Sequence, residues 1–278
     1  MMYQQEAVEI YYGPRDISFK KLIISFLKKG KLKQEYIDLL TTEDCMEVWG
    51  RAFTHSSVDP DNNYEYLEFL GDSIANAAIV WYFDQKFPQL RCQAGVKVLA
   101  RLKIQYVSKQ TFYEIAEKLG FWRFISGSVT SRQRSMKSML EDSLEALIGA
   151  TVELINKKIH PRAGFGIIQD IIEDLYNDLD ITLDYYKLFD SITILKEIFD
   201  NHKELGKMSY QTNTVKDETM DFPVSFAKVY AGNVLLAEGQ GAKMAIAKQN
   251  ASRVAIEKLK NRGIYPKISE IYKSFCKT

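Results

Sequence analysis

The sequence predicts an all-α domain followed by a small α+β domain, with the change of pattern near residue 190. Before that point, apolar residues recur every three or four positions, as on one face of an α-helix, and almost nothing alternates with a period of two. After it, an amphipathic stretch at 190–202 precedes three short alternating runs and a second amphipathic stretch. The second domain is therefore expected to follow the order α-β-β-β-α.

The helices of the first domain are delimited by residues that end helices. Their expected bounds are 18–29, 34–40, 65–86, 93–106, 108–119, 136–157 and 164–179. Pro88 follows the helix at 65–86, and Gly120 follows the helix at 108–119 as a C-terminal glycine. The polar segment at Gly127 and Ser128 is expected to form an exposed loop.

In the second domain, the alternating runs predict strands at 208–215, 224–230 and 234–239. Ala231-Gly232-Asn233 is the expected hairpin turn between the last two strands. Gly239-Gln240-Gly241 is expected to break the third strand before a closing helix at 242–259.

Two of the predicted helices carry carboxylates that share one helical face. Offsets of three, four and seven residues stack side chains along a helix, so Glu65, Glu68 and Asp72 lie together. Asp142 and Glu145 do so on the helix at 136–157. Apolar stripes on both helices indicate that these acids lie at a semi-buried seam. The alternative interpretation is a pair of ordinary solvated helix faces.

A seam of carboxylates needs a compensating positive charge. Neither acidic run contains a Lys or Arg, which favours a hard divalent cation bound by oxygen ligands. We expect Mg²⁺, for which Mn²⁺ can substitute, and no small-molecule cofactor. The absence of His and Cys from both runs argues against zinc.

The two acidic runs resemble the signature segments of ribonuclease III. Residues 65–73 read Glu-x-x-Glu-Phe-Leu-Gly-Asp-Ser, and residues 142–149 read Asp-x-x-Glu-Ala-Leu-Ile-Gly, in the same order and at a similar separation. Phe-Thr-His-Ser-Ser at 53–57 is similar to a third patch of that family. The resemblance covers about residues 44–179, and residues 188–262 resemble a double-stranded RNA-binding domain.

This resemblance implies a Mg²⁺-dependent endoribonuclease that cleaves double-stranded RNA by two-metal phosphodiester hydrolysis, leaving 5′-phosphates and short 3′ overhangs. Asp72 and Glu145 correspond to catalytic acids of the family, and Glu65 to a supporting acid. The implied metal ligands are Glu68, Asp72, Asp142 and Glu145. His55 is expected to be a structural residue beside the site.

The resemblance also implies partners. The expected partners are double-stranded RNA and a second copy of the chain, since Phe69 stands where the family buries an aromatic residue across its homodimer interface. A plain core phenylalanine is the alternative. Tyr66 stands where the family often has Arg, so an ion pair across the subunits is not expected there.

The C-terminal module departs from the family pattern. Its expected RNA contacts are Lys243, Lys248 and Arg253. Met244-Ala245-Ile246 stands where the family has a cluster of Lys, and the loop at 215–222 holds Asp217, Glu218 and Asp221 but no His. We therefore expect weak RNA affinity, with dimer or protein contact as the alternative role.

The expected organisation has four parts: an N-terminal basic helical extension at 1–40, a nuclease domain at 41–185, a double-stranded-RNA-binding-like domain at 188–262 and a tail at 263–278. The basic run at 15–33 is expected to be solvated. An RNA-contacting arm is its alternative role, with the lysines Lys20, Lys21, Lys28 and Lys29.

Composition narrows the class of protein further. No run of about 18 apolar residues suggests a membrane span, and the first residues show no signal-peptide pattern. Cys45, Cys92 and Cys276 lack metal-site spacing and are expected to be reduced thiols. The expected location is intracellular, either cytoplasmic or nuclear.

Two other functions fit part of the sequence. A catalytically silent ribonuclease III-like protein acting as an RNA-binding or scaffold protein would be expected to lack several of the acids, and all four are present here. An all-α nucleotide pyrophosphohydrolase also uses paired acids with Mg²⁺. That second function leaves residues 53–57 and the C-terminal module unexplained.

Overall fold

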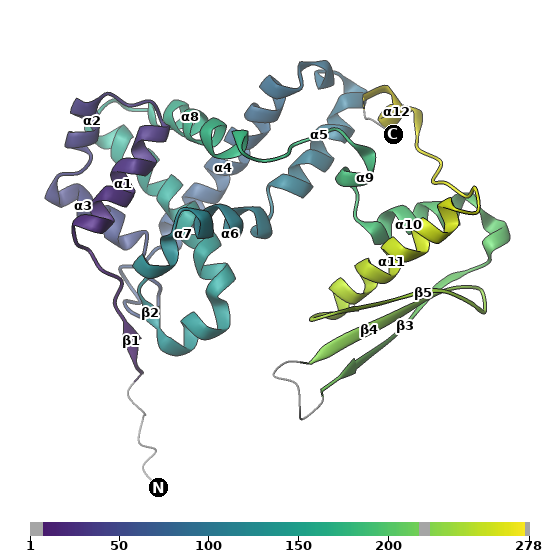
Figure 1. Ribbon diagram of the computed structural model, residues 1–278. Helices are drawn as coiled ribbons and strands as arrows, with labels where there is room; N and C mark the ends of the chain where they lie inside the picture. The colour runs from purple at the N-terminus through teal and green to yellow at the C-terminus, as the bar shows by residue number, and fades with distance from the viewer. Residues whose placement is uncertain (1–7, 217–222, 276–278) are drawn as a thin grey trace, which may run out of the picture. The chain divides into compact units, whose positions relative to one another are not determined.

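The computed structural model of the chain describes residues 8–216 and 223–275 (Figure 1). No helix within these ranges combines the length and the apolar character that a membrane span requires. Four residues that entered the sequence predictions lie outside the described ranges: Asp217, Glu218, Asp221 and Cys276.

Two compact units make up the described chain. The first is mainly helical and comprises the residues up to Cys92 together with Leu102–Asp180. The second comprises Gln93–Arg101 and the residues from Ile181 onward, and it contains a three-stranded sheet. The predicted order of a helical part followed by an α-β-β-β-α part is confirmed.

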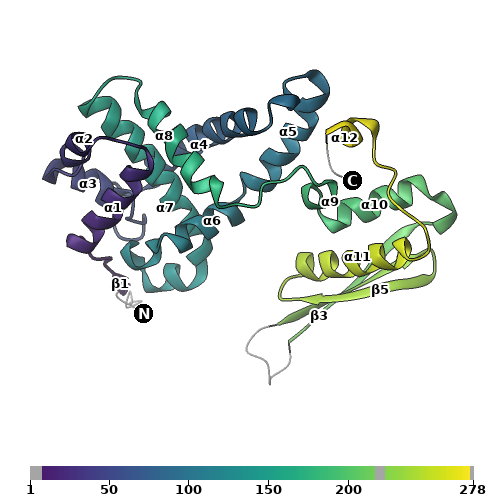
Figure 2. The same ribbon diagram turned by 45° about the horizontal axis from the view of Figure 1, so that its top comes forward.

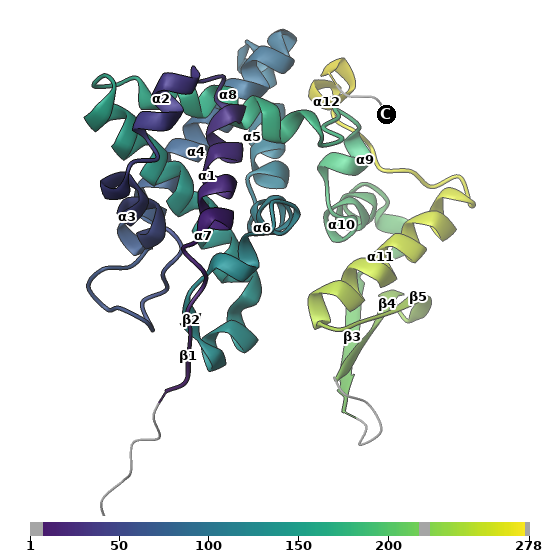
Figure 3. The same ribbon diagram turned by 60° about the vertical axis from the view of Figure 1, so that its left-hand side comes forward.

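The helical unit is built around α4 (Glu65–Lys86) and α7 (Val129–Lys158), which contact each other along much of their length. Helices α6 (Lys109–Lys118) and α8 (Gly164–Asn177) flank α7 (Figures 2 and 3). α5 (Gln93–Tyr106) is divided between the two units. The remaining α-helices described in this unit are α1 (Ile17–Lys29), α2 (Gln34–Leu39) and α3 (Glu43–Arg51).

Two glycines let α4 and α7 approach each other backbone to backbone. A Cβ atom on Gly71 would lie 1.8 Å from the carbonyl oxygen of Glu145, and one on Gly149 would lie 2.1 Å from that of Leu67. Both distances are far below van der Waals contact, so a larger residue at either position would force the helices apart. The close approach holds the acids of the two helices on facing turns.

α7 begins at Val129 rather than near residue 136, because Ser128 caps it. The Ser128 hydroxyl accepts a hydrogen bond from the Ser131 N–H at 3.0 Å, which satisfies a donor of the first turn. The helix bends at Ser135, whose φ of −127° is not helical. The first turns of α7 are polar and carry no apolar periodicity, so the sequence pattern placed the start of the helix too late.

Gly127 and Ser128 do not form the exposed loop that the sequence predicted. They form β2 (Gly127–Ser128), which pairs antiparallel with β1 (Ile10–Tyr11), and both residues are buried. The Ser57 hydroxyl anchors β2 by accepting a hydrogen bond from the Ser128 N–H at 2.8 Å. The segment is therefore part of the core of the helical unit.

The N-terminal segment is attached to α8 by ion pairs. Lys31 lies 2.9 Å from Asp170 and 2.9 Å from Glu173, and Lys29 pairs with Asp174. Lys29, which belongs to the RNA-contacting arm considered above, is thus engaged within the protein. The other lysines of that arm are exposed: Lys20, Lys21 and Lys28.

The second unit places two helices on one face of an antiparallel sheet (Figure 1). Gly232, with a φ of 57°, forms the predicted hairpin turn. The expected strand break at Gly239 does not occur: a Cβ there would lie 2.2 Å from the Ala251 nitrogen, so glycine lets α11 lie against the strand. The elements are α9 (Tyr185–Leu188), α10 (Ser191–Asn201), β3 (Met208–Val215), β4 (Val224–Ala231), β5 (Val234–Gly241), α11 (Met244–Lys260) and α12 (Glu270–Phe275).

Candidate metal centre

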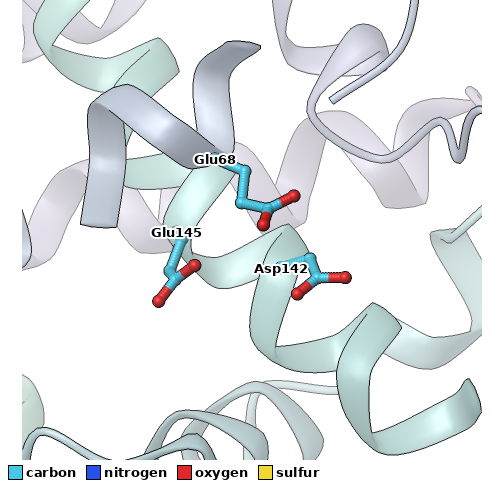
Figure 4. A group of neighbouring side chains, drawn as sticks. All are labelled: Glu68, Asp142 and Glu145. Carbon is cyan, nitrogen blue, oxygen red and sulfur yellow. The ribbon is translucent and has the colours of Figure 1, made fainter. Parts of the chain in front are cut away.

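Three carboxylates converge where α4 and α7 meet (Figure 4). Glu68 comes from α4, whereas Asp142 and Glu145 come from successive turns of α7. Each side chain offers an oxygen, and these oxygens all lie within 4.8 Å of one another. The spacing that groups Asp142 with Glu145 follows from the helical repeat, and the Gly71–Gly149 contact brings Glu68 to them.

Burial and mutual repulsion make these three acids reluctant to ionise. Glu145 is 8% exposed, and burial together with the charge of Asp72 raises its pKa to about 8. Burial, followed by the charge of Asp142, raises the pKa of Glu68 to about 7. Burial also raises the pKa of Asp142. Carboxylate charge is therefore disfavoured here unless a cation compensates it.

The donor set fits a hard divalent cation. The cluster consists of carboxylates alone, held on two rigid helices, and it borders an open pocket of about 460 Å³. Mg²⁺ takes oxygen ligands, uses few protein carboxylates and keeps several of its waters, for which an open pocket leaves room. The same donor set offers zinc neither of its preferred ligands, His and Cys.

Asp72 and Glu65, the other acids predicted for the site, lie outside this triplet. Asp72 lines the same pocket as Glu68 and Glu145 but is exposed, and its carboxylate accepts a hydrogen bond from Asn76 at 2.6 Å. Glu65 is exposed in the first turn of α4 and adds negative charge that helps to raise the pKa of Glu68. The structure thus places Asp72 beside the cluster and Glu65 at its edge.

Tyr64 and His55 support the cluster from the segment that precedes α4. The buried Tyr64 hydroxyl donates a hydrogen bond to Asp142 at 3.2 Å, and burial raises the pKa of Tyr64, so the donor keeps its proton. The His55 ring stacks edge-on against Tyr64, and its Nδ1 accepts the Ser57 N–H at 2.9 Å. Burial lowers the pKa of His55, so its ring is neutral near pH 7. Sequence reasoning gave Tyr64 no role, although it directly precedes the first acidic run.

Sequence reasoning also missed a cation that faces the acids from another helix. Lys109, at the start of α6, lies 3.0 Å from the Oε2 atom of Glu141. Glu141 is 5% exposed and directly precedes Asp142, and it lines the pocket together with Lys109, Glu68 and Glu145. The sequence shows no base within either acidic run, but Lys109 lies outside both runs. It reaches the acids because α6 packs on α7.

An apolar surface lies on the outer side of α4. Phe69 is 76% exposed and Tyr66, three residues earlier, is 67% exposed. A phenylalanine with this exposure does not belong to the core of its own chain. The core alternative for Phe69 is therefore wrong.

The residues predicted to contact RNA from the second unit lie along α11. Lys243 occupies the N-cap position, Arg253 is exposed, and the Lys248 ammonium lies 5.5 Å from the centroid of the Tyr210 ring. Ile246 is 45% exposed in the first turn. The start of α11 thus presents an apolar side chain where phosphate binding would need a cation.

Comparison with known proteins shows similarity to ribonucleases. The profile of the Ribonuclease III domain matches residues 65–153. A protein of Invertebrate iridescent virus 6 assigned as a ribonuclease 3 is 37% identical over 215 residues, which cover 73% of this chain and 73% of that protein. A Frog virus 3 protein with the same assignment is 41% identical over 177 residues, covering 63% of this chain and 47% of that protein. The ribonuclease 3 of Natranaerobius thermophilus is 29% identical over 213 residues, covering 75% of this chain and 86% of that protein.

The chain combines a helical unit, which has a carboxylate cluster at the junction of two helices, with an α-β-β-β-α unit, as the resemblance of its sequence to ribonuclease III implies. Identity to the Invertebrate iridescent virus 6 protein extends over most of both chains, and the domain profile covers both acidic runs. The chain belongs to the ribonuclease III family. The prediction of this family and its enzyme class from the sequence is confirmed.

Proposed function

We propose that this protein is a divalent-cation-dependent endoribonuclease that cleaves double-stranded RNA. The observation that carries the proposal is the convergence of Glu68, Asp142 and Glu145, whose oxygens lie within 4.8 Å of one another in a chain of this family. The nearest cation, Lys109, pairs with Glu141 rather than with these three carboxylates, and carboxylates buried this closely are expected to bind a cation of their own.

We propose Glu68, Asp142 and Glu145 as ligands of Mg²⁺, with Asp72 as a further ligand from the same pocket wall for a second ion. Mn²⁺ should substitute, because it accepts the same oxygen donors. When bound there, Mg²⁺ would make a water nucleophilic at neutral pH, and the ion would also neutralise charge on the leaving 3′ oxygen. Asp72 and Glu145 are the residues that we propose as catalytic.

The protein's own residues prepare the site for these ligands. The Gly71–Gly149 contact fixes the spacing between the two helices, so the carboxylates need little rearrangement to share a cation. Tyr64 holds one oxygen of Asp142, which leaves the other oxygen available as a ligand. Products with 5′-phosphates and short 3′ overhangs are expected from this chemistry on a duplex.

We propose that the active form is a homodimer formed through the outer face of α4. One carboxylate cluster can cut one strand, so cutting both strands of a duplex needs two clusters related by a two-fold axis. The exposed rings of Phe69 and Tyr66 supply an apolar surface next to the cluster, since Phe69 directly follows Glu68. An isologous contact through this face would bring the two sites of the dimer together.

We propose residues 41–185 as the nuclease domain and 188–262 as a double-stranded-RNA-binding-like domain, between an N-terminal extension at 1–40 and a tail at 263–278. Weak RNA contact by the second domain is supported by the apolar first turn of α11. Action on RNA implies an intracellular location, either cytoplasmic or nuclear. The basic residues assigned to this contact are Lys243, Lys248 and Arg253.

The proposal is tested by incubating the full chain with a labelled duplex and with each of its strands alone, in Mg²⁺ or in excess chelator. We expect cleavage of the duplex only with Mg²⁺ and little cleavage of the single strands. Glu145→Gln should lower the rate by orders of magnitude. Glu117→Gln is the matched control, because Glu117 is an exposed glutamate on α6 that accepts a hydrogen bond from Tyr113 and should not affect the rate. Duplex binding without cleavage by the wild type would support the scaffold function instead.

A further inference from the structure

Lys109 stands on the wall of the pocket opposite the metal-binding acids. Its Nζ atom lies 3.0 Å from Glu141, yet its side chain is 81% exposed whereas that of Glu141 is 7% exposed. The ion pair therefore joins a solvent-facing ammonium on a flexible stem to a carboxylate that α7 holds in place. Lys109 stays hydrated in either position, so it can exchange this contact for another once a bound cation compensates the buried Glu141 carboxylate.

The charges around the pocket do not balance. Four carboxylates line it, and a single ammonium, that of Lys109, faces them; the four acids are Glu68, Asp72, Glu141 and Glu145. Lys109 contacts Glu141 rather than the carboxylates of the candidate metal cluster. A cation bound to that cluster would supply the positive charge that Lys109 now supplies to its acidic surroundings, which would free Lys109 to bind an anion.

We propose that Lys109 binds a phosphate of the RNA next to the cleaved bond and pairs with Glu141 when RNA and metal are absent. The inference rests on the proposed function, since it assigns a substrate contact to the same pocket. Carboxylates alone repel a phosphate, so an ammonium on the facing wall gives the substrate backbone a partner. The pocket, about 460 Å³ in volume and lined on that side by Ser108 and Phe112, is large enough for such a group.

If Lys109 has this role, removing its ammonium should change the affinity for the RNA duplex and the affinity for the metal ion in opposite directions. Removing the ammonium takes away a phosphate contact, so duplex affinity should fall. It also takes away a positive charge that competes with the metal ion for the same acids, so metal affinity should rise. A misfolded variant would lose affinity for both ligands, so the opposite signs separate a role in the site from a structural role.

The first measurement is duplex binding by the full chain at two salt concentrations, with Ca²⁺ replacing Mg²⁺ so that the RNA stays intact. Lys109→Ala should bind about three- to tenfold more weakly, with a salt slope smaller by about one, because one phosphate contact is lost. Lys109→Arg should restore most of the affinity. The matched control is Lys118→Ala, which removes an exposed, ion-paired lysine from the other end of α6, where it contacts Asp178 at 2.6 Å.

The second measurement is Mn²⁺ binding by calorimetry without RNA, in which Lys109→Ala should bind about threefold more tightly or better. The inference requires both effects. Unchanged or weaker Mn²⁺ binding by this variant overturns it, as does a duplex affinity and salt slope equal to those of the wild type. If the wild type binds Mn²⁺ but cuts no duplex, the proposed nuclease function is refuted. Failure of that function is thereby distinguished from failure of the role proposed for Lys109.

Discussion

Replacing Glu145 by glutamine should make the metal-free protein more stable while it removes activity. In the folded protein, the pKa of Glu145 is raised from an ordinary 4.5 to about 8. Between these two pH values, the folded protein therefore binds a proton that the unfolded chain has lost. Stability must then fall as the pH rises through this window, and the full penalty is present above pH 8. Below about pH 4.5 both states are protonated, and the penalty is absent.

The magnitude follows from the size of this pKa difference. Each pKa unit corresponds to about 1.36 kcal/mol, which gives an upper limit near 5 kcal/mol for ionising Glu145 in the folded protein. Glu145 borders an open pocket, and water that enters it screens part of the charge, so we expect about 1–3 kcal/mol. Glutamine has nearly the same shape and carries no charge, so Glu145→Gln should recover this amount at high pH.

The assay is thermal unfolding of the wild type and Glu145→Gln in excess chelator at pH 5 and pH 8.5. At pH 8.5 the variant should melt about 2–10 °C higher, and at pH 5 the two proteins should nearly coincide. Added Mg²⁺ should raise the melting temperature of the wild type more than that of the variant. If the variant is less stable than the wild type at pH 8.5, or if its melting temperature is shifted equally at both pH values, ionisation of Glu145 does not destabilise the metal-free protein.

Three further predictions concern the dimer, the ligand support and the second domain. Phe69→Asp places a charge in an apolar contact, so light scattering should report a monomer that no longer makes double-strand cuts; an active dimer would contradict the interface. Tyr64→Phe removes the hydrogen bond to Asp142, so Mn²⁺ binding measured by calorimetry should weaken by about tenfold while the fold is retained. Unchanged Mn²⁺ affinity would mean that the Tyr64 hydroxyl does not orient Asp142. Removing three positive charges together from α11 and its N-cap should lower duplex affinity by less than about threefold and change the salt slope by less than about one. A larger loss of duplex affinity would show that the second domain carries the binding. The three substitutions are Lys243→Ala, Lys248→Ala and Arg253→Ala.

Local periodicity was enough to predict the elements that hold the candidate site. The bounds of α4 at 65–86 and of β3 at 208–215 agree with the sequence prediction, because each has a clear repeat and α4 is followed by Pro88. The same repeat grouped Asp142 with Glu145, since residues three apart share a helical face. These relations depend on neighbouring residues alone.

Features that depend on contacts between distant segments were not predictable from the sequence. The pairing of β1 with β2 joins two-residue strands separated by more than a hundred positions, too short to show alternation. Lys109 reaches Glu141 only because α6 packs on α7. Asp72 shares the acidic face of α4, yet its carboxylate is bound by Asn76 one turn later, and helical spacing does not reveal which partner an acid takes.

We propose that the cluster of Glu68, Asp142 and Glu145 serves a dimeric nuclease that cuts both strands of an RNA duplex. The most direct test is to incubate the full chain with a long RNA duplex and Mg²⁺ and to map the ends of the products on both strands. We expect paired cuts that leave 5′-phosphates and short 3′ overhangs. Cuts confined to one strand, cleavage of single-stranded RNA alone, or undiminished cleavage in excess chelator would contradict it.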